Sequence, residues 1–210
     1  MTATSIPSAA PSISPDLVAD VLRSPSARRV SLARPVGPTP TRPALGIDTI
    51  VDIASGLARA EELWRPHVRH DDLSRTSVRL VATEAYEVWL LGWAPGQGVD
   101  LHDHGGANAA FVVLDGELDE LTLGFAGITT RRLATGAVGT VAAGAIHDVV
   151  NRGPADATSI HVYSDPLRTM TFYEPDGTPR YTEIVEEVPA LVTSSPDTAR
   201  ALHPSAPGAG

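Results

Sequence analysis

The sequence predicts an all-β fold with N-terminal helices, of the sandwich or small-barrel kind. From about residue 77 to residue 165 the chain is a series of short β-type runs, punctuated by Gly, Pro, Asn and Asp. Such runs, closely spaced and without helices between them, are typical of antiparallel sandwiches and small barrels. Ahead of them, residues 46–64 have the pattern of one or two helices.

Each element rests on its own pattern. The helical segment carries Ile50, Ile53, Leu57 and Leu63 at roughly helical spacing. The β-type runs are SVRLVAT, YEVWLLGW, FVVLDGELDELTLGF, TRRLAT, GTVAAG, HDVVNRG and TSIHVYSD. One further strand is expected within residues 166–185, near MTFYEP.

The chain is long enough for one domain with a complete core, at 210 residues of which 42% are hydrophobic. Residues 1–45 are rich in Ser, Pro, Ala and Thr and are predicted to be mostly disordered, apart from a short amphipathic helix at about 15–23. Residues 46–190 form the predicted globular domain, and residues 191–210 form a disordered tail.

Composition excludes several classes of function. The formal net charge of −9, without clustered basic residues, argues against a nucleic-acid partner. There is no apolar run near 18 residues and no signal-peptide pattern, so we expect no membrane span and a cytoplasmic location. The protein is also expected to be a monomer. The absence of cysteine excludes disulfides, thiolate metal ligands and a cysteine nucleophile.

Three histidines indicate a metal site. His102 and His104 are separated by one residue, and positions i and i+2 of a β-strand face the same side, so both imidazoles could reach one ion. His147 lies in another β-like run. Three imidazoles on a β scaffold would leave coordination positions open, which suggests chemistry at the metal.

The histidines lie in two glycine-bounded stretches. These are GQGVDLHDHGGANAAFVVLDG at residues 96–116 and GAVGTVAAGAIHDVVN at residues 136–151. Their spacing resembles the two conserved stretches of the cupin superfamily, which implies a double-stranded β-helix, or jelly-roll, small barrel. Ala109 stands where the cupin glutamate ligand is expected, and Ala142 where a proline is expected. The alternative is a metal-free, sugar-binding cupin.

The absence of the cupin glutamate ligand points to a smaller group within the superfamily. Cupins that keep three histidines without it are similar to the thiol dioxygenases, above all the cysteine dioxygenase family. Further stretches that look like that family are Trp93, LHDHGG, GEL at 116–118, HDVVN at 147–151 and SIHVYSDPL at 159–167. The resemblance covers about residues 60–180. It implies a non-haem Fe(II) enzyme that adds both atoms of O2 to the sulfur of a small thiol, with L-cysteine as the expected substrate.

The chemistry of the donor set agrees with that implication. Three neutral imidazoles leave an Fe(II) ion with its full charge of +2, whereas a carboxylate ligand would lower it. An anionic, soft thiolate would therefore bind well, and the expected product is a sulfinate. The histidine spacing alone does not distinguish iron from nickel, manganese or zinc.

Ser159, His161 and Tyr163 alternate along one run, so on a strand they share a face. By resemblance to cysteine dioxygenases they form a hydrogen-bonded relay beside the metal, in which Tyr163 contacts substrate or oxygen and His161 is not a ligand. The alternative for His161 is a core histidine with satisfied hydrogen bonds. Because the chain has no cysteine, Tyr163 lacks the Cys–Tyr crosslink of the animal enzymes, whose cysteine position is Ala109 here.

The family also implies an arginine that holds the substrate carboxylate. The best match in this sequence is Arg79, within SVRLV, since a guanidinium can bind a carboxylate through two parallel hydrogen bonds. The alternative for Arg79 is a surface salt bridge. Two other functions stay open, namely a dioxygenase of another small thiol, such as 3-mercaptopropionate, and a non-catalytic cupin that binds a metal or ligand.

Overall fold

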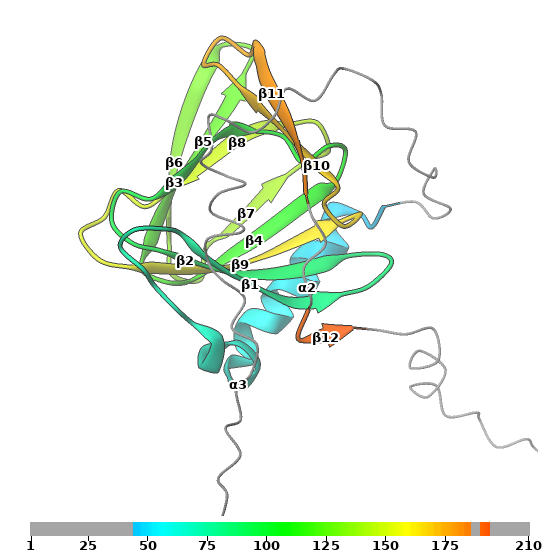
Figure 1. The fold of residues 1–210 in the computed structure, drawn as a ribbon, viewed down its shortest axis with the longest axis vertical. Helices are drawn as coiled ribbons and strands as arrows, with labels where there is room; N and C mark the ends of the chain where they lie inside the picture. Colours follow the sequence, from blue (N-terminus) through cyan, green and yellow to red (C-terminus); the bar gives the residue numbers. More distant parts are fainter. Residues whose placement is uncertain (1–43, 186–189, 194–210) are drawn as a thin grey trace, which may run out of the picture.

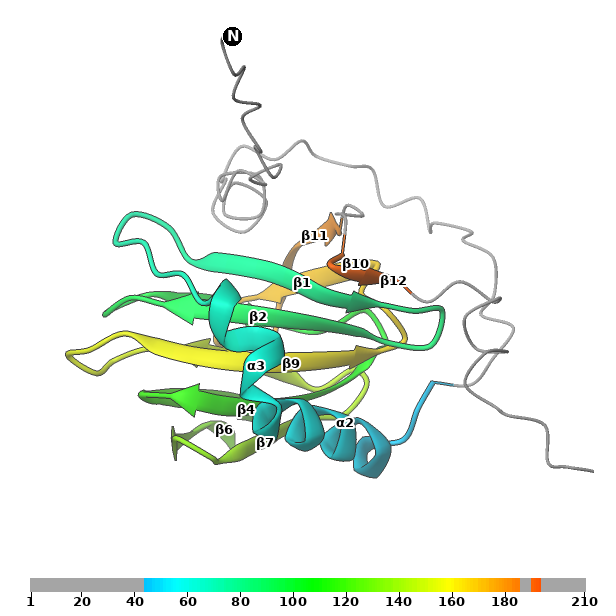
Figure 2. The same cartoon turned by 90° about the horizontal axis from the view of Figure 1, so that it is seen from below.

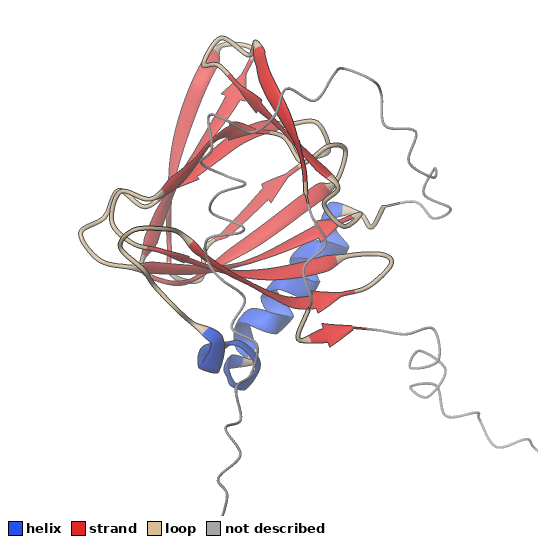
Figure 3. Ribbon diagram, in the orientation of Figure 1, coloured by secondary structure: helices blue, strands red, loops and turns tan. Residues whose placement is uncertain are grey.

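The structure is a computed structural model that describes residues 44–185 and 190–193 (Figure 1). The helix expected at residues 15–23 lies outside these residues. Among the described residues three helical elements come first, and the other elements are strands (Figure 3). The helices are α2 (Ile47–Arg59), α3 (Glu61–Trp64) and the 3-10 helix η1 (Arg65–His67). None of the helices in the described ranges is long and apolar enough to cross a membrane.

The strands of the described residues form two six-stranded sheets that face each other. The first sheet has the order β12-β1-β2-β9-β4-β7. Its strands are β1 (Thr76–Ala82), β2 (Glu87–Trp93), β4 (Asn108–Asp115), β7 (Val138–Val141), β9 (Ala157–Ser164) and β12 (Val192–Thr193). The second sheet has the order β11-β10-β3-β8-β5-β6. Its strands are β3 (Gly98–His102), β5 (Glu117–Gly124), β6 (Gly127–Ala134), β8 (Ile146–Val150), β10 (Thr169–Tyr173) and β11 (Pro179–Ile184).

This arrangement confirms the predicted cupin fold, a small antiparallel barrel preceded by helices. Its apolar side chains form two clusters, one between the sheets and one between the first sheet and α2, which runs across the outer face of that sheet (Figure 2). Side chains of β2 point alternately to the two faces of the sheet and so contribute to both clusters. Trp89 and Trp93 point between the sheets, whereas Val88 and Leu90 face the helix.

The helical segment expected at residues 46–64 is present, but only part of its predicted apolar face is buried. Ile50 is fully buried, but Leu63 is 55% exposed and Trp64 is buried instead. The reason is a break in the helix, because Ala60 adopts φ −92° and ψ 65°. The residues after Ala60 therefore start a new helix, and the apolar spacing does not continue across it.

The C-terminal part contains more strands than the sequence predicts. Residues 166–185 form two strands, β10 and β11, joined by a turn in which Gly177 has φ +85°. Most side chains of β11 are exposed, so this edge strand lacks the apolar alternation that would have revealed it. In addition, β12 pairs in parallel with β1 and lies inside the predicted tail, 191–210.

Candidate metal centre

Three buried imidazoles converge between the sheets. His102 ends β3 and His147 lies on β8, where the two are direct cross-strand partners. His104 follows in the next turn. One nitrogen of each ring lies within 4.8 Å of the others, and each of the three residues is at most 4% exposed. The structure thus brings together all three histidines that the sequence singles out.

The route by which His104 reaches the site differs from the expectation. Strand β3 ends at His102, so the two histidines are not alternate residues of one strand. His104 is placed by a turn in which Gly105 has φ +59° and Gly106 has φ +100°. The Asp103 carboxylate holds this turn, since it accepts hydrogen bonds from the Gly105 amide and the Tyr173 hydroxyl.

The surroundings of His102 and His104 favour their neutral form. Burial lowers the pKa of His102 well below its usual range, and the neighbouring His147 lowers it further. Burial and the other two rings do the same for the pKa of His104. A neutral imidazole keeps a lone pair for coordination, so these nitrogens suit a metal ion of intermediate softness. The donor set therefore fits a metal with open coordination positions.

A buried carboxylate that the sequence analysis missed lies behind His147. The Nδ1–H of His147 donates to Oε1 of Glu120 over 3.3 Å, and Arg131 donates to Oε2 over 2.8 Å. Burial alone would raise the pKa of Glu120, but the hydrogen bonds from His147 and Arg131 outweigh it and lower the pKa, so the group is ionised. The sequence held a signal, because Glu120 alternates with the apolar Leu118 on the inner face of β5.

The expected chain of polar side chains is present on β9. The Tyr163 hydroxyl lies 3.3 Å from Nδ1 of His161, whose Nε2 lies 2.9 Å from Oγ of Ser159. Trp93 extends this chain by donating to Ser159 over 2.9 Å. The ring of Tyr163 is 5.0 Å from that of His104 between centroids, so the chain ends beside the imidazole cluster. Burial raises the pKa of Tyr163, which keeps its hydroxyl protonated.

A small cavity of about 80 Å³ opens beside the histidines. Its wall is mostly apolar and includes Trp89 and Trp93. The polar side chains that line it are Arg75, Ser77, His102, His147, His161 and Tyr163. A mostly apolar pocket with a few convergent polar groups is the usual form of a small-molecule site.

The arginine of the cavity is Arg75, not Arg79. The Arg75 guanidinium lies over the Trp93 ring at 4.7 Å from its centroid. Arg79 is instead 2.8 Å from a carboxylate oxygen of Glu87, in an ion pair whose side chains are 12% and 2% exposed. Arg79 is therefore engaged by a buried partner and is absent from the described cavity lining. In the antiparallel pair of β1 and β2, Arg79 lies opposite Trp89, whereas Arg75 precedes β1 and lies over Trp93.

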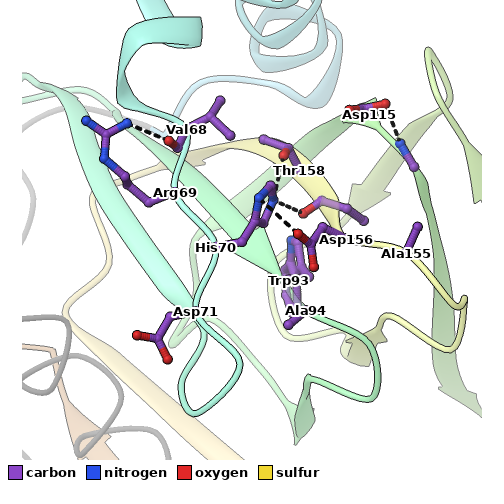
Figure 4. Close-up of polar contacts among 12 residues, drawn as sticks. Val68, Arg69, His70, Asp71, Trp93, Ala94, Asp115, Ala155, Asp156 and Thr158 are labelled. Carbon is purple, nitrogen blue, oxygen red and sulfur yellow. Dashed lines mark hydrogen bonds and ion pairs between the residues drawn. The ribbon is translucent and has the colours of Figure 1, made fainter.

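The loop that leads to Arg75 is anchored at the start of β9 (Figure 4). The Nε2 of His70 lies 3.0 Å from the Ala157 carbonyl and from the Thr158 hydroxyl. Its Nδ1 lies 3.5 Å from the Asp156 carboxylate. The His70 side chain is 24% exposed. These contacts fix the loop beside the cavity.

A second buried carboxylate, Glu183 on β11, gives a pH-dependent prediction. Its oxygens have no hydrogen-bond partner among the described residues, and burial raises its pKa from 4.5 to about 7. Above pH 7 the folded protein must hold this group charged, which costs stability, and the cost falls as the pH drops from 7 and is nearly gone at pH 4, below the unfolded-state pKa of 4.5. We expect Glu183→Gln to raise the free energy of unfolding by about 1–3 kcal/mol at pH 8 and to change it little at pH 4.

Urea unfolding at the two pH values measures this difference. Glu174→Gln is the matched control, because Glu174 is exposed and its removal should give the same small change at both. A Glu183→Gln variant that is no more stable than the parent protein at pH 8 would contradict the prediction.

Comparison with known proteins identifies the family. The cysteine dioxygenase type I family matches residues 41–176, which is more than half of the chain. This chain belongs to that family. The match includes the three histidines, the β9 chain of polar residues and Arg75. For this member of the cysteine dioxygenase type I family, the cupin fold and a three-histidine metal centre are therefore consistent with both sequence and geometry.

Solved structures resemble the chain more distantly. A protein from Thermus thermophilus is 24% identical, with a TM-score of 0.45, and the match covers 49% of this chain and 93% of that one. A protein with a double-stranded β-helix domain from Klebsiella pneumoniae is 17% identical, with a TM-score of 0.44 and coverages of 59% and 94%. A cupin superfamily protein from Desulfitobacterium hafniense is also 17% identical, with a TM-score of 0.42 and coverages of 49% and 87%. No curated protein matches the chain.

Proposed function

We propose that this protein is a non-haem iron(II) thiol dioxygenase whose substrate is a small thiol that carries a carboxylate, with L-cysteine the expected one. The observation that carries the proposal is the cavity itself, a small apolar space lined by two of the three convergent imidazoles, His102 and His147, together with one arginine and one buried tyrosine. The reaction adds both atoms of O2 to sulfur, so that RSH becomes RSO2H. Sulfur loses four electrons and O2 gains four, so no other reductant is needed.

The metal would be held by His102, His104 and His147, and it would supply sites for thiolate and O2 together with the redox chemistry. The protein supplies position and protons. Tyr163 is protonated, lies against His104 and lines the cavity, so its hydroxyl could donate a hydrogen bond to a substrate bound there. His161 and Ser159 fix the orientation of that hydroxyl through the β9 chain.

Arg75 takes the role that the sequence analysis gave to Arg79. A guanidinium stacked on Trp93 and facing a mostly apolar cavity suits a bidentate contact with a carboxylate. The ion pair between Arg79 and Glu87 leaves Arg79 a structural role on the neighbouring part of the same strand pair. The preferred thiol is accordingly an anionic one.

The test is oxygen consumption by protein loaded anaerobically with Fe(II). The thiol panel would contain L-cysteine, 3-mercaptopropionate, cysteamine and mercaptosuccinate, with the sulfinate identified by mass. Uptake with cysteine and a matching amount of sulfinate would support the proposal. Uptake with another thiol alone would change the substrate but keep the reaction. No uptake from protein that holds iron would favour the non-catalytic cupin.

Arg75→Ala gives a sharper prediction about the substrate. We expect it to lower kcat/KM for carboxylate-bearing thiols by about 10- to 100-fold, chiefly through KM, because it removes a hydrogen bond between charged groups. Turnover of cysteamine, which has no carboxylate, should change less than threefold. Arg65→Ala is the control, since Arg65 pairs with Glu61 on the surface. Equal losses for cysteine and cysteamine would show that Arg75 does not recognise the carboxylate.

A further inference from the structure

The three imidazoles differ in what holds the nitrogen that faces away from the centre. Nδ1 of His147 contacts the Glu120 carboxylate at 3.3 Å, and Nδ1 of His102 contacts the Asp100 carbonyl at 2.8 Å. Nδ1 of His104 is buried and has no hydrogen-bond partner among the described residues. Among the described residues, His147 therefore has a charged acceptor, His102 has a neutral acceptor and His104 has no acceptor.

The carboxylate behind His147 is held rigidly in place. Glu120 is 4% exposed, and its second oxygen accepts a 2.8 Å ion pair from Arg131 on the neighbouring strand β6. Cross-strand pairing sets the geometry, because Glu120 is the direct partner of Arg131 on one side and of Val149 on the other. Val149 is two residues from His147, so Glu120 and His147 are diagonal neighbours on the inner face of the sheet.

We infer that Glu120 is a positioning residue that fixes the orientation of His147 and makes it the strongest electron donor of the three ligands. A carboxylate that accepts the Nδ1–H keeps the proton on that nitrogen and leaves the Nε2 lone pair for the ion. It also raises the basicity of the ring more than a carbonyl can. The three ligands should therefore rank His147, then His102, then His104 in donor strength.

This ranking has a chemical consequence for the centre. Ala109 stands where the cupin glutamate ligand is expected, and the Glu120 carboxylate lies instead behind one histidine. The ion would keep its full charge toward an incoming thiolate, while the Glu120 charge still strengthens one metal–nitrogen bond. Arg131 compensates that charge, so the cluster does not gain a net negative charge from it.

The direct test is NMR of the wild-type protein loaded with Zn(II), which is diamagnetic, with 15N-labelled histidine. The Nδ1–H proton of His147 should resonate furthest downfield, followed by that of His102, and the proton of His104 should exchange fastest with water. A His147 proton upfield of the His102 proton would overturn the inference. Because this experiment uses no variant of Glu120, its outcome does not depend on how such a variant folds.

The variant test measures metal affinity. Glu120→Gln keeps an oxygen acceptor but removes its charge, so we expect the affinity for Zn(II) to fall by about 10-fold or more. It should also move only the His147 proton resonance. The matched control is Glu117→Gln, because Glu117 lies on the same strand but is half-exposed and pairs with Arg132. A folded Glu120→Gln variant with unchanged affinity and an unchanged His147 resonance would overturn the inference.

These readouts concern the metal ligands and use no thiol. The inference rests on the three-histidine centre of the proposed function and not on its substrate. A protein that shows the expected ranking but consumes no oxygen with any thiol would refute the proposed reaction and leave the role of Glu120 standing.

Discussion

His147→Ala should abolish both metal binding and thiol oxidation. The substitution removes one of three converging nitrogens, and it removes the one that Glu120 orients. Loss of an outer partner alone costs about 10- to 100-fold in metal affinity, so loss of the ligand itself should cost more than about 100-fold. Co(II) titration followed by absorbance measures the affinity, and oxygen uptake with the Fe(II) form measures turnover, which should fall to the background rate.

His67→Ala is the matched control for this prediction. His67 lies on η1, on the helical side of the first sheet, and it is not part of the ligand cluster. The control should bind metal and oxidise thiol like the parent protein. Retention of one tightly bound ion per chain by His147→Ala, in protein with an unchanged near-ultraviolet spectrum, would show that the centre is not the one described.

Arg79→Met should lower the free energy of unfolding and leave the metal affinity of the folded protein unchanged. The substitution leaves the Glu87 carboxylate, which is 2% exposed, without its guanidinium partner. Breaking a buried ion pair on one side typically costs about 3–5 kcal/mol, because an uncompensated charge stays in the interior. We expect a loss of this size in the free energy of unfolding from urea titration, together with unchanged Co(II) affinity of the folded protein.

A second substitution separates this charge effect from lost packing. Glu87 also accepts a hydrogen bond from the Leu167 amide, and Glu87→Gln retains that acceptor while it removes the charge. The double variant Arg79→Met, Glu87→Gln should therefore recover most of the lost stability. Arg65→Ala, which breaks an exposed pair with Glu61, should cost less than about 1 kcal/mol. A single variant as stable as the parent would contradict the assigned role of Arg79.

Features set by local periodicity could be predicted from the sequence. Alternation on one strand was enough to bring Ser159, His161 and Tyr163 to a common face, and the structure places them in hydrogen-bonding order. The convergence of His102, His104 and His147 was also expected from their spacing. His104 reaches the cluster by another route than expected, because a glycine turn and not strand alternation places its ring.

Features that depend on pairing between strands could not be predicted. Glu120 meets His147 only because β5 and β8 are neighbours in register, and no local pattern states which strands pair. The ion pair of Arg79 with Glu87 depends in the same way on the pairing of β1 with β2, which no local pattern states. Strand β11 was missed because an exposed edge strand carries little apolar alternation.

The direct pairing of His102 with His147 also bears on how the barrel assembles. The two residues come from strands far apart in the chain, and a slip of one residue between β3 and β8 would turn one imidazole to the outer face. Only the correctly aligned barrel offers all three nitrogens to one ion. A bound metal therefore stabilises that alignment alone, by mass action, and disfavours every misaligned one. Metal binding therefore selects the barrel in which β3 and β8 are correctly aligned. A chain that folds with these strands slipped would fail to retain the metal.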